Sequence, residues 1–326
     1  MRFSQQEKME IIRLVDGSDL GVTRTLKELG IHKSTFYPWY HAYQQYGFDG
    51  LATKPRANKQ VWNRIPQEER NRVVETALEH EALSPRELAC FITDRHQYYI
   101  SESSVYRILK EHGLIASPGY IILSASDSFK DKTTRPNEMW QTDFTYFKII
   151  GWGWYYLSTV MDDYSRYILS WELCKTMKAE DAESSIRKAL AHAQLNPRQR
   201  PKLLSDNGSA YIAQELKDYL ETEGIQQVHG RPCHPQTQGK IERYNRSLKN
   251  IIKLENYFFP EELENAVSKF VYYYNHHRYH ESLNNLKPAD VYYGKGHAII
   301  EKRRKIKMRT MRSRRRIYLK SKAIRE

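Results

Sequence analysis

One stretch of the sequence constrains the fold more than any other, residues 234–249, HPQTQGKIERYNRSLK. Its second half predicts a helix, because apolar side chains recur there at spacings of three and four residues. Glu242 is the only acid in this stretch, and Lys249 follows it by about two helical turns, so both side chains can face the same ligand. A metal ion held by the acid, with an anionic substrate bound to the metal, suits these surroundings. The apolar stripe consists of Ile241, Tyr244 and Leu248, and the cations are Arg243, Arg246 and Lys249.

A single glutamate cannot hold a pair of metal ions, so further acids are expected where strands end. Asp143 lies in the run WQTDFTYFKII, whose aromatic and β-branched residues favour a strand. Asp206 closes a short apolar run and precedes an Asn-Gly pair, which is a turn signal. There are 35 residues between Asp206 and Glu242. The sequence therefore offers three acids, two on strands and one on a helix.

The segments WQTDFTY, LLSDNGSAY and HPQTQGKIERYNRSLK occur in this order. Together they resemble the DDE transposases of bacterial insertion sequences, which have a retroviral-integrase-like catalytic core. The likeness covers residues 135–294, about half of the chain. It implies an α/β ribonuclease-H-like core, a mixed sheet flanked by helices, in which Asp143, Asp206 and Glu242 are catalytic and hold the metal. It also implies that Asn207 and Lys249 contact DNA near the scissile phosphate.

The resemblance also implies the chemistry. Two Mg²⁺ ions are expected because the ligands are hard oxygens, with Mn²⁺ as a substitute. An in-line displacement at phosphorus would cleave transposon ends and join them to target DNA. The implied partners are double-stranded DNA, both ends and target, and further copies of the chain, as a dimer or a higher oligomer on DNA. Two alternatives stay open, namely a DNA-binding regulator without catalysis and a metal-dependent nuclease without strand transfer.

The order of predicted elements in this region fits an α/β core. Strands come first, and helices then alternate with strands. Beyond the strand that contains Asp143, strands are predicted at 155–161, 167–173, 202–205 and 225–228, helices at 178–193 and 213–223, and a hairpin turn at 151–154.

The N-terminal part of the chain predicts a helix-turn-helix. Residues 4–15 form an amphipathic pattern, and residues 21–37 predict a helix, a turn at Gly30 and a second helix that opens near Ser34. That second helix would lie in the major groove of DNA. Pro38 departs from the pattern, because proline removes a helical hydrogen bond and would shift or bend the helix. The alternative is a three-helix packing unit without a DNA role. The expected base-reading residues are His32, Lys33, Ser34, Thr35 and Tyr37.

A second helical unit is predicted at residues 67–118. Residues 84–87, Ser-Pro-Arg-Glu, match an N-cap, a proline at the first helical position and a glutamate at the third. A further helix opens within residues 100–110. We interpret this unit as a second helix-turn-helix, which would lengthen the DNA sequence that is recognised. The inward-facing residues of its first helix, 67–80, are expected to be Val73, Val74, Ala77 and Leu78, and its DNA-facing residues Ser103, Ser104 and Arg107.

The net charge of +13 is concentrated near the C-terminus. Residues 302–325 hold 13 of the 52 Lys and Arg residues and no acid. Such a block is typical of a nucleic-acid-binding arm or of a solvated end. The alternating residues 305–312 would allow a strand laid on DNA, and Arg314, Arg315 and Arg316 are expected DNA contacts. The predicted organisation is a DNA-binding domain at 1–50, a linker at 51–66, a second DNA-binding domain at 67–118, a linker at 119–135, a catalytic core at 136–295 and a basic tail at 296–326.

Several acids, cysteines and histidines suggest a metal site or a disulfide framework, but their spacing does not match one. Asp162 and Asp163 precede Tyr-Ser-Arg and are interpreted as a turn rather than as metal ligands. Three well-separated cysteines do not predict a disulfide framework. A zinc site is not expected at His229, Cys233 and His234, which lack a second pair of ligands, and a structural or DNA-backbone role is expected for His276, His277 and His280.

The location of the protein is predicted from what the sequence lacks. No run of eighteen apolar residues occurs, and the first residues do not have the layout of a signal peptide. We therefore expect a cytoplasmic, nucleoid-associated protein without membrane contact.

Overall fold

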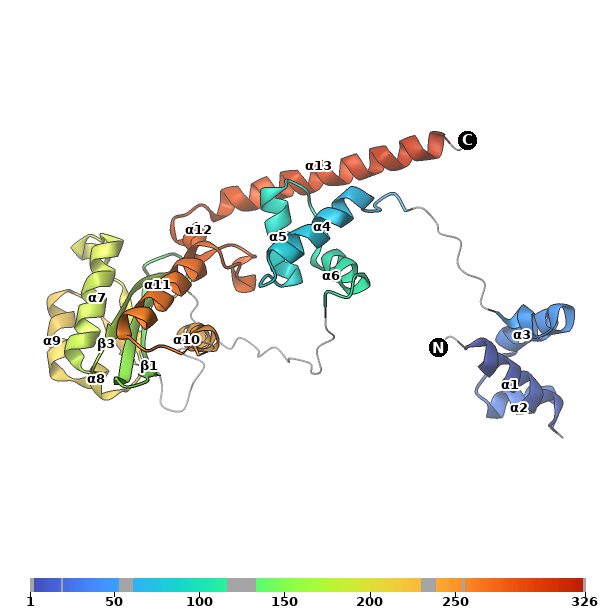
Figure 1. Cartoon of the computed structure of the whole chain (residues 1–326), viewed down its shortest axis with the longest axis horizontal. Helices are drawn as coiled ribbons and strands as arrows, with labels where there is room; N and C mark the ends of the chain where they lie inside the picture. Colours follow the sequence, from blue (N-terminus) through green and yellow to red (C-terminus); the bar gives the residue numbers. More distant parts are fainter. Residues whose placement is uncertain are drawn as a thin grey trace. The chain divides into compact units, whose positions relative to one another are not determined.

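The computed structural model describes residues 3–18, 20–52, 61–115, 133–229, 239–253 and 256–324. The chain divides into two compact units, Met1–Trp62 and Asn63–Glu326 (Figure 1). Most residues of the two predicted linkers lie outside the described ranges, as do residues 230–238. None of the helices in these ranges is long and apolar enough to cross a membrane.

The first unit has the predicted helix-turn-helix. Ser4 caps α1, because its hydroxyl accepts the Glu7 N–H and the Glu7 carboxylate accepts the Ser4 N–H. Gly30, at φ +67, makes the turn between α2 and α3. Pro38 lies inside α3 without ending it. The core includes Ile12, Leu26, Phe36 and Leu51, so buried residues of this unit continue one position beyond the predicted domain boundary. Its elements are α1 Gln5–Asp16, α2 Val22–Glu28, α3 Lys33–Tyr46 and the 3-10 helix η1 Gly47–Leu51.

The second helical unit comprises α4 Gln67–Glu79, α5 Pro85–Arg95 and α6 Glu102–Glu111. The predicted capping box at Ser84 and Glu87 is present. The inward position of Leu78 was predicted wrongly, since its side chain is 56% exposed. Thr76 is buried instead, because it lies three residues after the buried Val73 and so on the same face of α4.

The core contains a five-stranded mixed sheet in the order β3-β2-β1-β4-β5. The pairs β1–β2 and β2–β3 are antiparallel, whereas β1–β4 and β4–β5 are parallel. Positive φ angles at Gly151 and Gly153 allow the predicted hairpin turn. The ribonuclease-H-like fold class is confirmed. The strands are β1 Met139–Ile149, β2 Gly153–Asp162, β3 Ile168–Cys174, β4 Lys202–Ser205 and β5 Gln227–His229.

Helices cover both faces of this sheet. Side chains alternate along a strand, so Leu157 and Val160 of β2 point to opposite faces. Leu157 joins a core with α10 and α11, and Val160 joins a core with α7, α8 and α9. The predicted apolar stripe of α10 is confirmed, because its members are at most 1% exposed. The helices are α7 Ala179–Ala193, α8 Ser209–Ile212, α9 Gln214–Thr222, α10 Gly239–Ile252, α11 Pro260–His276 and α12 Pro288–Tyr292.

The basic tail is a long helix, α13 Gly296–Ala323, which contacts α5 (Figure 1). The predicted strand at 305–312 is therefore wrong. Ile306, Thr310 and Arg314 recur every four residues and are buried on one face of the helix. The Thr310 hydroxyl accepts the Tyr99 N–H at 3.0 Å. Packing of this face, rather than solvation of a free arm, determines where the helix lies.

Arg314 was expected to contact DNA, and this prediction is wrong. Its side chain is 6% exposed and donates to the Tyr98 hydroxyl at 2.7 Å and to the Tyr99 carbonyl at 2.8 Å. A second tie lies nearer the start of the helix, where Arg303 makes two hydrogen bonds to Asp94, at 2.8 and 2.7 Å. Both arginines are thus used to hold α13 against the second helix-turn-helix.

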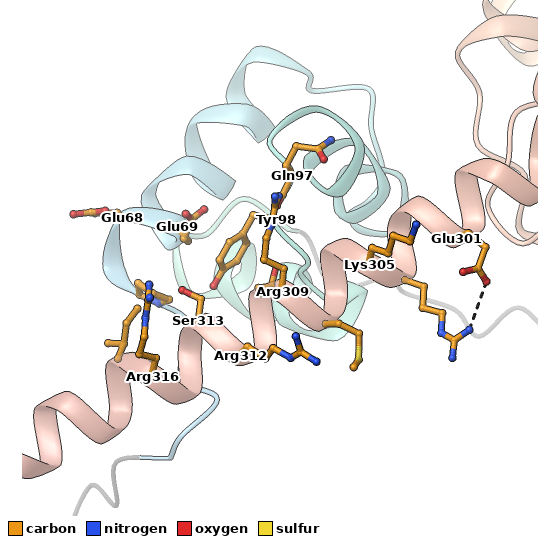
Figure 2. A pocket seen from close by; sticks show the side chains of 15 residues that line it. Glu68, Glu69, Gln97, Tyr98, Glu301, Lys305, Arg309, Arg312, Ser313 and Arg316 are labelled. Atoms are coloured by element: carbon orange, nitrogen blue, oxygen red, sulfur yellow. Dashed lines mark hydrogen bonds and ion pairs between the residues drawn. The ribbon is translucent and has the colours of Figure 1, made fainter.

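An open groove of about 1090 Å³ lies between α13 and the start of α4 (Figure 2). Its lining carries charges of both signs, with Glu68 and Glu69 from α4 and several cations from α13. None of the three predicted catalytic acids lines it. The cations labelled in Figure 2 are Lys305, Arg309, Arg312 and Arg316.

Candidate active site

The first two acids lie on neighbouring parallel strands. The register of β1 and β4 pairs Gln141 with Leu204. Extending this register by two residues brings Asp206, just after β4, level with Asp143 in β1. Neighbouring strands are about 4.8 Å apart, so Asp143 and Asp206 lie side by side at the point where β4 ends.

Helix α10 brings the third acid to the same place. Its Asn245 side-chain amide donates to Asp143 Oδ2 at 2.8 Å, and its Ile241 N–H donates to Gln141 Oε1 at 3.1 Å. Glu242 lies one turn before Asn245 and therefore on the same side of the helix. Two hydrogen bonds to β1, one on each side of Glu242 in sequence, thus position this residue.

The three acids affect one another electrostatically. Burial, and then the neighbouring Asp206, raises the pKa of Asp143 to about 6. The Asn245 hydrogen bond acts in the opposite direction, and Glu242 adds a smaller upward effect. Asp206 and Glu242 are exposed, whereas Asp143 is half-buried. Asp206 and Glu242 follow Asp143 by 63 positions or more in the sequence. Both are nevertheless within electrostatic range of it in the folded chain, as the predicted triad requires.

The donor set fits a divalent ion. All three groups offer carboxylate oxygens, the ligands that Mg²⁺ prefers. A cation between them would favour the ionised form of Asp143, which burial and the neighbouring acids disfavour. Across the described ranges, no three His, Cys, Asp or Glu groups already lie close enough to share one ion. The three carboxylates are thus neighbours, but they are not yet close enough to bind one ion together.

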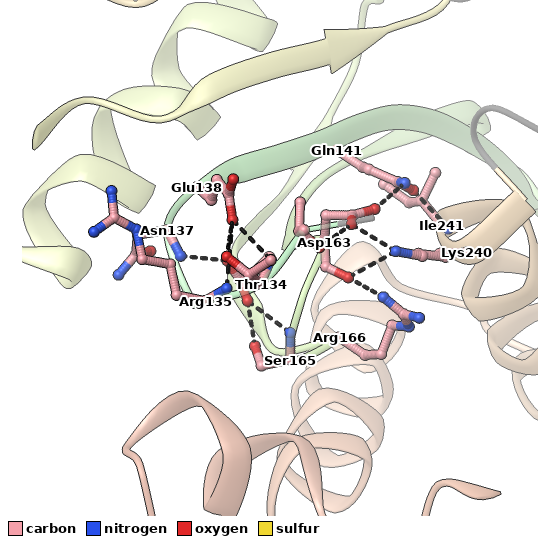
Figure 3. Close-up of polar contacts among 12 residues, drawn as sticks. Thr134, Arg135, Asn137, Glu138, Gln141, Asp163, Ser165, Arg166, Lys240 and Ile241 are labelled. Carbon is pink, nitrogen blue, oxygen red and sulfur yellow. Dashed lines mark hydrogen bonds and ion pairs between the residues drawn. The ribbon is translucent and has the colours of Figure 1, made fainter. Parts of the chain in front are cut away.

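Asp162 and Asp163 form the predicted turn between β2 and β3. Asp163 also contacts residues outside this turn (Figure 3). Asp163 is 2% exposed and accepts hydrogen bonds from Gln141 at 2.7 Å and from Lys240 at 2.5 Å. Lys240 and Ile241 both belong to the first turn of α10. Asp163 and Gln141 therefore anchor the start of the helix that carries Glu242.

The predicted cations of α10 do not all surround the acid. The Lys249 ammonium lies 4.3 Å from the centre of the Tyr146 ring, and its pKa is lowered by burial and by Lys253, while Asp143 acts in the opposite direction. Arg246 is exposed and lies one turn after Glu242. Arg243 lies elsewhere, since it acts electrostatically on Arg166, Tyr274 and His280. Its predicted contact with DNA stays a prediction.

The loop after β4 holds Asp206 in place. The Gly208 N–H donates to Asp206 Oδ1 at 2.9 Å, and a Cβ atom at residue 208 would lie 2.9 Å from that same oxygen. A side chain at residue 208 would therefore push the Asp206 carboxylate away from this position. Asn207, between them, is exposed. The His229 ring lies 3.3 Å from the Asp206 carbonyl, whereas Cys233 and His234 lie outside the described residues.

The other histidine prediction concerns His276, His277 and His280. Burial, followed by the effect of Arg278, lowers the pKa of His280 to about 3, so this ring is neutral. It lies edge-on to Tyr274 with 4.9 Å between the ring centres. His276 contacts Tyr272, and His277 contacts both Tyr272 and Tyr273. All of these are packing contacts between aromatic rings within the fold.

The predicted DNA-reading residues lie on exposed helix starts in both helix-turn-helix units. Lys33, Ser34, Thr35 and Tyr37 are exposed in the first turns of α3, next to the exposed His32. In α6, Arg107 donates to the Ser103 carbonyl at 3.0 Å and to the Ser104 hydroxyl at 3.4 Å. On α13, Arg315 and Arg316 are exposed. The exposed side chains among these residues can be reached by DNA.

Three functional residues were missed from the sequence, namely Gln141, Asp163 and Asn245. Asn245 could have been found, because it lies one turn after Glu242 on a predicted helix. Gln141 points to the side of β1 that Asp143 occupies, at a spacing of two residues. The partners of Asp163 are 22 and 77 residues away, so no local pattern indicated its role.

Family profiles match most of the chain. The integrase core domain profile matches residues 133–235, and a second integrase core domain profile matches 223–288. A helix-turn-helix domain profile matches residues 7–59, and a homeodomain-like domain profile matches 35–109. Among solved structures, the catalytic core domain of HTLV-2 integrase in complex with magnesium is 22% identical, with a TM-score of 0.40, and covers 48% of this chain and 97% of that chain.

Two bacterial relatives are similar over about half of this chain. The transposase InsK for insertion sequence element IS150 of Escherichia coli (strain K12) is 31% identical over 160 residues, which cover 49% of this chain and 56% of that protein. An uncharacterized transposase-like protein of Haemophilus influenzae is 30% identical over 158 residues, which cover 48% of this chain and 71% of that protein. The chain therefore belongs to the family of transposases with an integrase core domain.

Proposed function

We propose that this protein is a transposase that binds the ends of its element, cleaves DNA there and joins the ends to target DNA. The observation that carries the proposal is the gathering of Asp143, Asp206 and Glu242 at one edge of the sheet, where Asp206 and Glu242 both raise the pKa of Asp143. Acids that repel one another in this way are typical of a site that binds cations. Family membership supports the same reaction class, phosphoryl transfer between polynucleotides.

The three acids would hold two Mg²⁺ ions, with Mn²⁺ as a substitute. When bound, such ions activate an attacking oxygen and neutralise charge on the leaving oxygen. The protein's own residues position the acids. Asn245 orients the Asp143 carboxylate, while Gln141 and Asp163 fix the start of α10. Lys249, held beside Tyr146 and within electrostatic range of Asp143, would bind a phosphate of the substrate.

DNA recognition would be divided among three surfaces. The first turns of α3 would read bases through Lys33, Ser34, Thr35 and Tyr37, and α6 would add Ser103, Ser104 and Arg107. The exposed side of α13 would contact phosphates through Arg315 and Arg316. Near the acids, Asn207 and Arg246 would contact the cleaved strand. The working form would be a dimer or higher oligomer on DNA, associated with the nucleoid.

Incubation of the full chain with a duplex carrying the inverted repeats that flank its gene, a target plasmid and Mg²⁺ tests the proposal. Joined products are expected. Cut products without joining would support a nuclease instead, and a shifted band with neither would support a regulator without catalysis. A parallel reaction with a chelator controls for metal-independent nicking.

A further inference from the structure

Four arginines from four different elements gather around Tyr274 and His280. Arg86 comes from α5 of the second helix-turn-helix, Arg166 from the turn between β2 and β3, Arg243 from α10, and Arg278 from the segment after α11. All four act electrostatically on His280, whose pKa is lowered mainly by burial and then by these cations. Three of them also act on Tyr274, namely Arg278, Arg166 and Arg243.

Direct contacts place these groups together. The Arg278 guanidinium lies 5.5 Å from the centre of the Tyr274 ring, and the His280 ring lies edge-on to that ring. On the other side, Arg166 and Lys240 both donate to the main-chain carbonyl of Asp163 (Figure 3).

The remaining two arginines are placed by their neighbours. Arg243 follows Lys240 by three residues and so lies on the same side of α10. Arg86 donates to the Asn285 side chain, and the Asn285 N–H donates to the His280 carbonyl at 2.8 Å. The cluster therefore joins α5, α10 and the end of α11.

The charges of this cluster are only partly balanced, because Arg166 lies within electrostatic range of Asp163 and Asp162. Among the described residues, none of the four guanidinium groups forms an ion pair with a carboxylate. Arg303, by contrast, is paired with Asp94 at 2.7 Å. Arg86, Arg166 and Arg278 are half-buried, so their mutual repulsion is only partly screened by water. An anion bound among them would offset this repulsion and would find several guanidinium donors.

We propose that Arg86, Arg166, Arg243 and Arg278 form a seat for one phosphodiester group of bound DNA. The seat begins at the residue directly after Glu242 and reaches α5. A DNA backbone that runs from the acids toward the second helix-turn-helix would cross it. Guanidinium groups bind phosphate oxygens in pairs, so the seat would fix the position of the strand without reading its sequence. The assignment to DNA rests on the DNA binding in the proposed function.

The seat is tested by a double variant, Arg243→Gln with Arg278→Gln, in the full chain. The matched control, Arg198→Gln with Lys202→Gln, removes two exposed cations from the same unit. Affinity for a short linear duplex of arbitrary sequence is measured against salt concentration, with a chelator present to prevent cleavage. Loss of one phosphate contact is expected to lower the slope of log affinity against log salt by about 0.9. The control should keep the wild-type slope, and melting temperatures no lower than that of the wild type would show that all the proteins are folded.

A slope equal to that of the control would overturn the proposal. A second measurement separates DNA from free anions, namely the melting temperature in inorganic phosphate and in chloride at equal ionic strength. If phosphate protects the wild type but the DNA slope does not change, the seat binds free phosphate and the assignment to DNA is wrong. Neither readout needs catalysis. A wild type that cuts no DNA would refute the transposase proposal, yet a lowered slope in the variant would still support the seat.

Discussion

Asn245 donates its side-chain amide hydrogen to Oδ2 of Asp143 at 2.8 Å, so the helix that carries Glu242 is tied directly to the strand that carries the first acid. The side-chain oxygen of Asn245, Oδ1, is buried without a hydrogen-bond partner among the described residues. Such an amide is costly to bury, and the single hydrogen bond to Asp143 therefore has a positioning role.

Replacing any one acid of the triad should stop catalysis but not DNA binding. Asp143→Asn, Asp206→Asn and Glu242→Gln each remove a metal ligand of the proposed site, so cleavage and joining should fall by at least about 100-fold. Product formation on radiolabelled end DNA and a gel-shift measurement give the two readouts. Glu221→Gln, an exposed acid on α9, is the matched control. Normal joining by any of the three variants would remove that residue from the assignment.

Asp143→Asn should stabilise the metal-free protein near neutral pH. The folded-state pKa of about 6 is above the reference value of 3.8, so the folded protein binds this proton more tightly than the unfolded chain. Stability should then fall as the pH rises between these two values, and the cost is complete above pH 6. Removing the charge should recover about 2–3 kcal/mol at about pH 7 and nothing below about pH 4.

Unfolding in denaturant with a chelator, followed at several pH values, measures this effect. The variant should lose the part of the pH dependence that lies between 3.8 and about 6. Parallel curves for wild type and variant across this window would show that Asp143 titrates normally in the folded chain.

Lys240→Met should destabilise the catalytic unit. Asp163 is buried, and without Lys240 the hydrogen bonds to its carboxylate come only from the neutral side chains of Gln141 and Thr133 among the described residues. We therefore expect a cost of about 3 kcal/mol in the free energy of unfolding. Adding Asp163→Asn removes the buried charge and should recover much of that loss. Lys188→Met breaks an exposed pair with Glu172 and should cost less than about 1 kcal/mol. If the double variant is as unstable as Lys240→Met alone, the charge pair is not the cause.

Neighbouring arginines of α13 should behave differently. Arg314→Gln loses hydrogen bonds to Tyr98 and Tyr99 and should lower the free energy of unfolding by about 1–3 kcal/mol. Arg315→Gln with Arg316→Gln should leave stability unchanged but should lower the salt dependence of DNA binding by up to about 0.9 per lost contact. Thermal melting and salt titration separate the two effects. An unchanged salt slope in the Arg315 and Arg316 variant would leave these residues as solvated side chains.

Variants of the first helix-turn-helix should lose sequence discrimination. Lys33→Ala and Thr35→Ala should each reduce the preference for end DNA over random DNA by about 1–3 kcal/mol. Competition binding measures the ratio of the two affinities. Lys27→Ala, an exposed cation of α2, serves as the control because it removes the same charge outside the recognition helix. Equal losses on both DNAs would mean that Lys33 contacts phosphates only.

Local patterns predicted much of this molecule. The capping residues at Ser84 and Glu87, the apolar stripe of α10 and the strand that contains Asp143 depend on neighbours in sequence, and all are present. The burial of Arg314 could not be predicted, because its partners lie 215 and 216 residues earlier. The same limit applies to Asp163, whose sequence neighbours indicate a turn while its distant partners make it an anchor.

The contact between α13 and the segment Gln97–Tyr99 also bears on how the protein is made. The Tyr99 N–H finds its acceptor only when residue 310 exists, and Arg314 follows four residues later. On the ribosome, α4, α5 and α6 are complete long before this partner is synthesised. The second helix-turn-helix therefore leaves the ribosome with the face that receives α13 still uncovered. Its final packing has to wait until residues 310 and 314 have been translated.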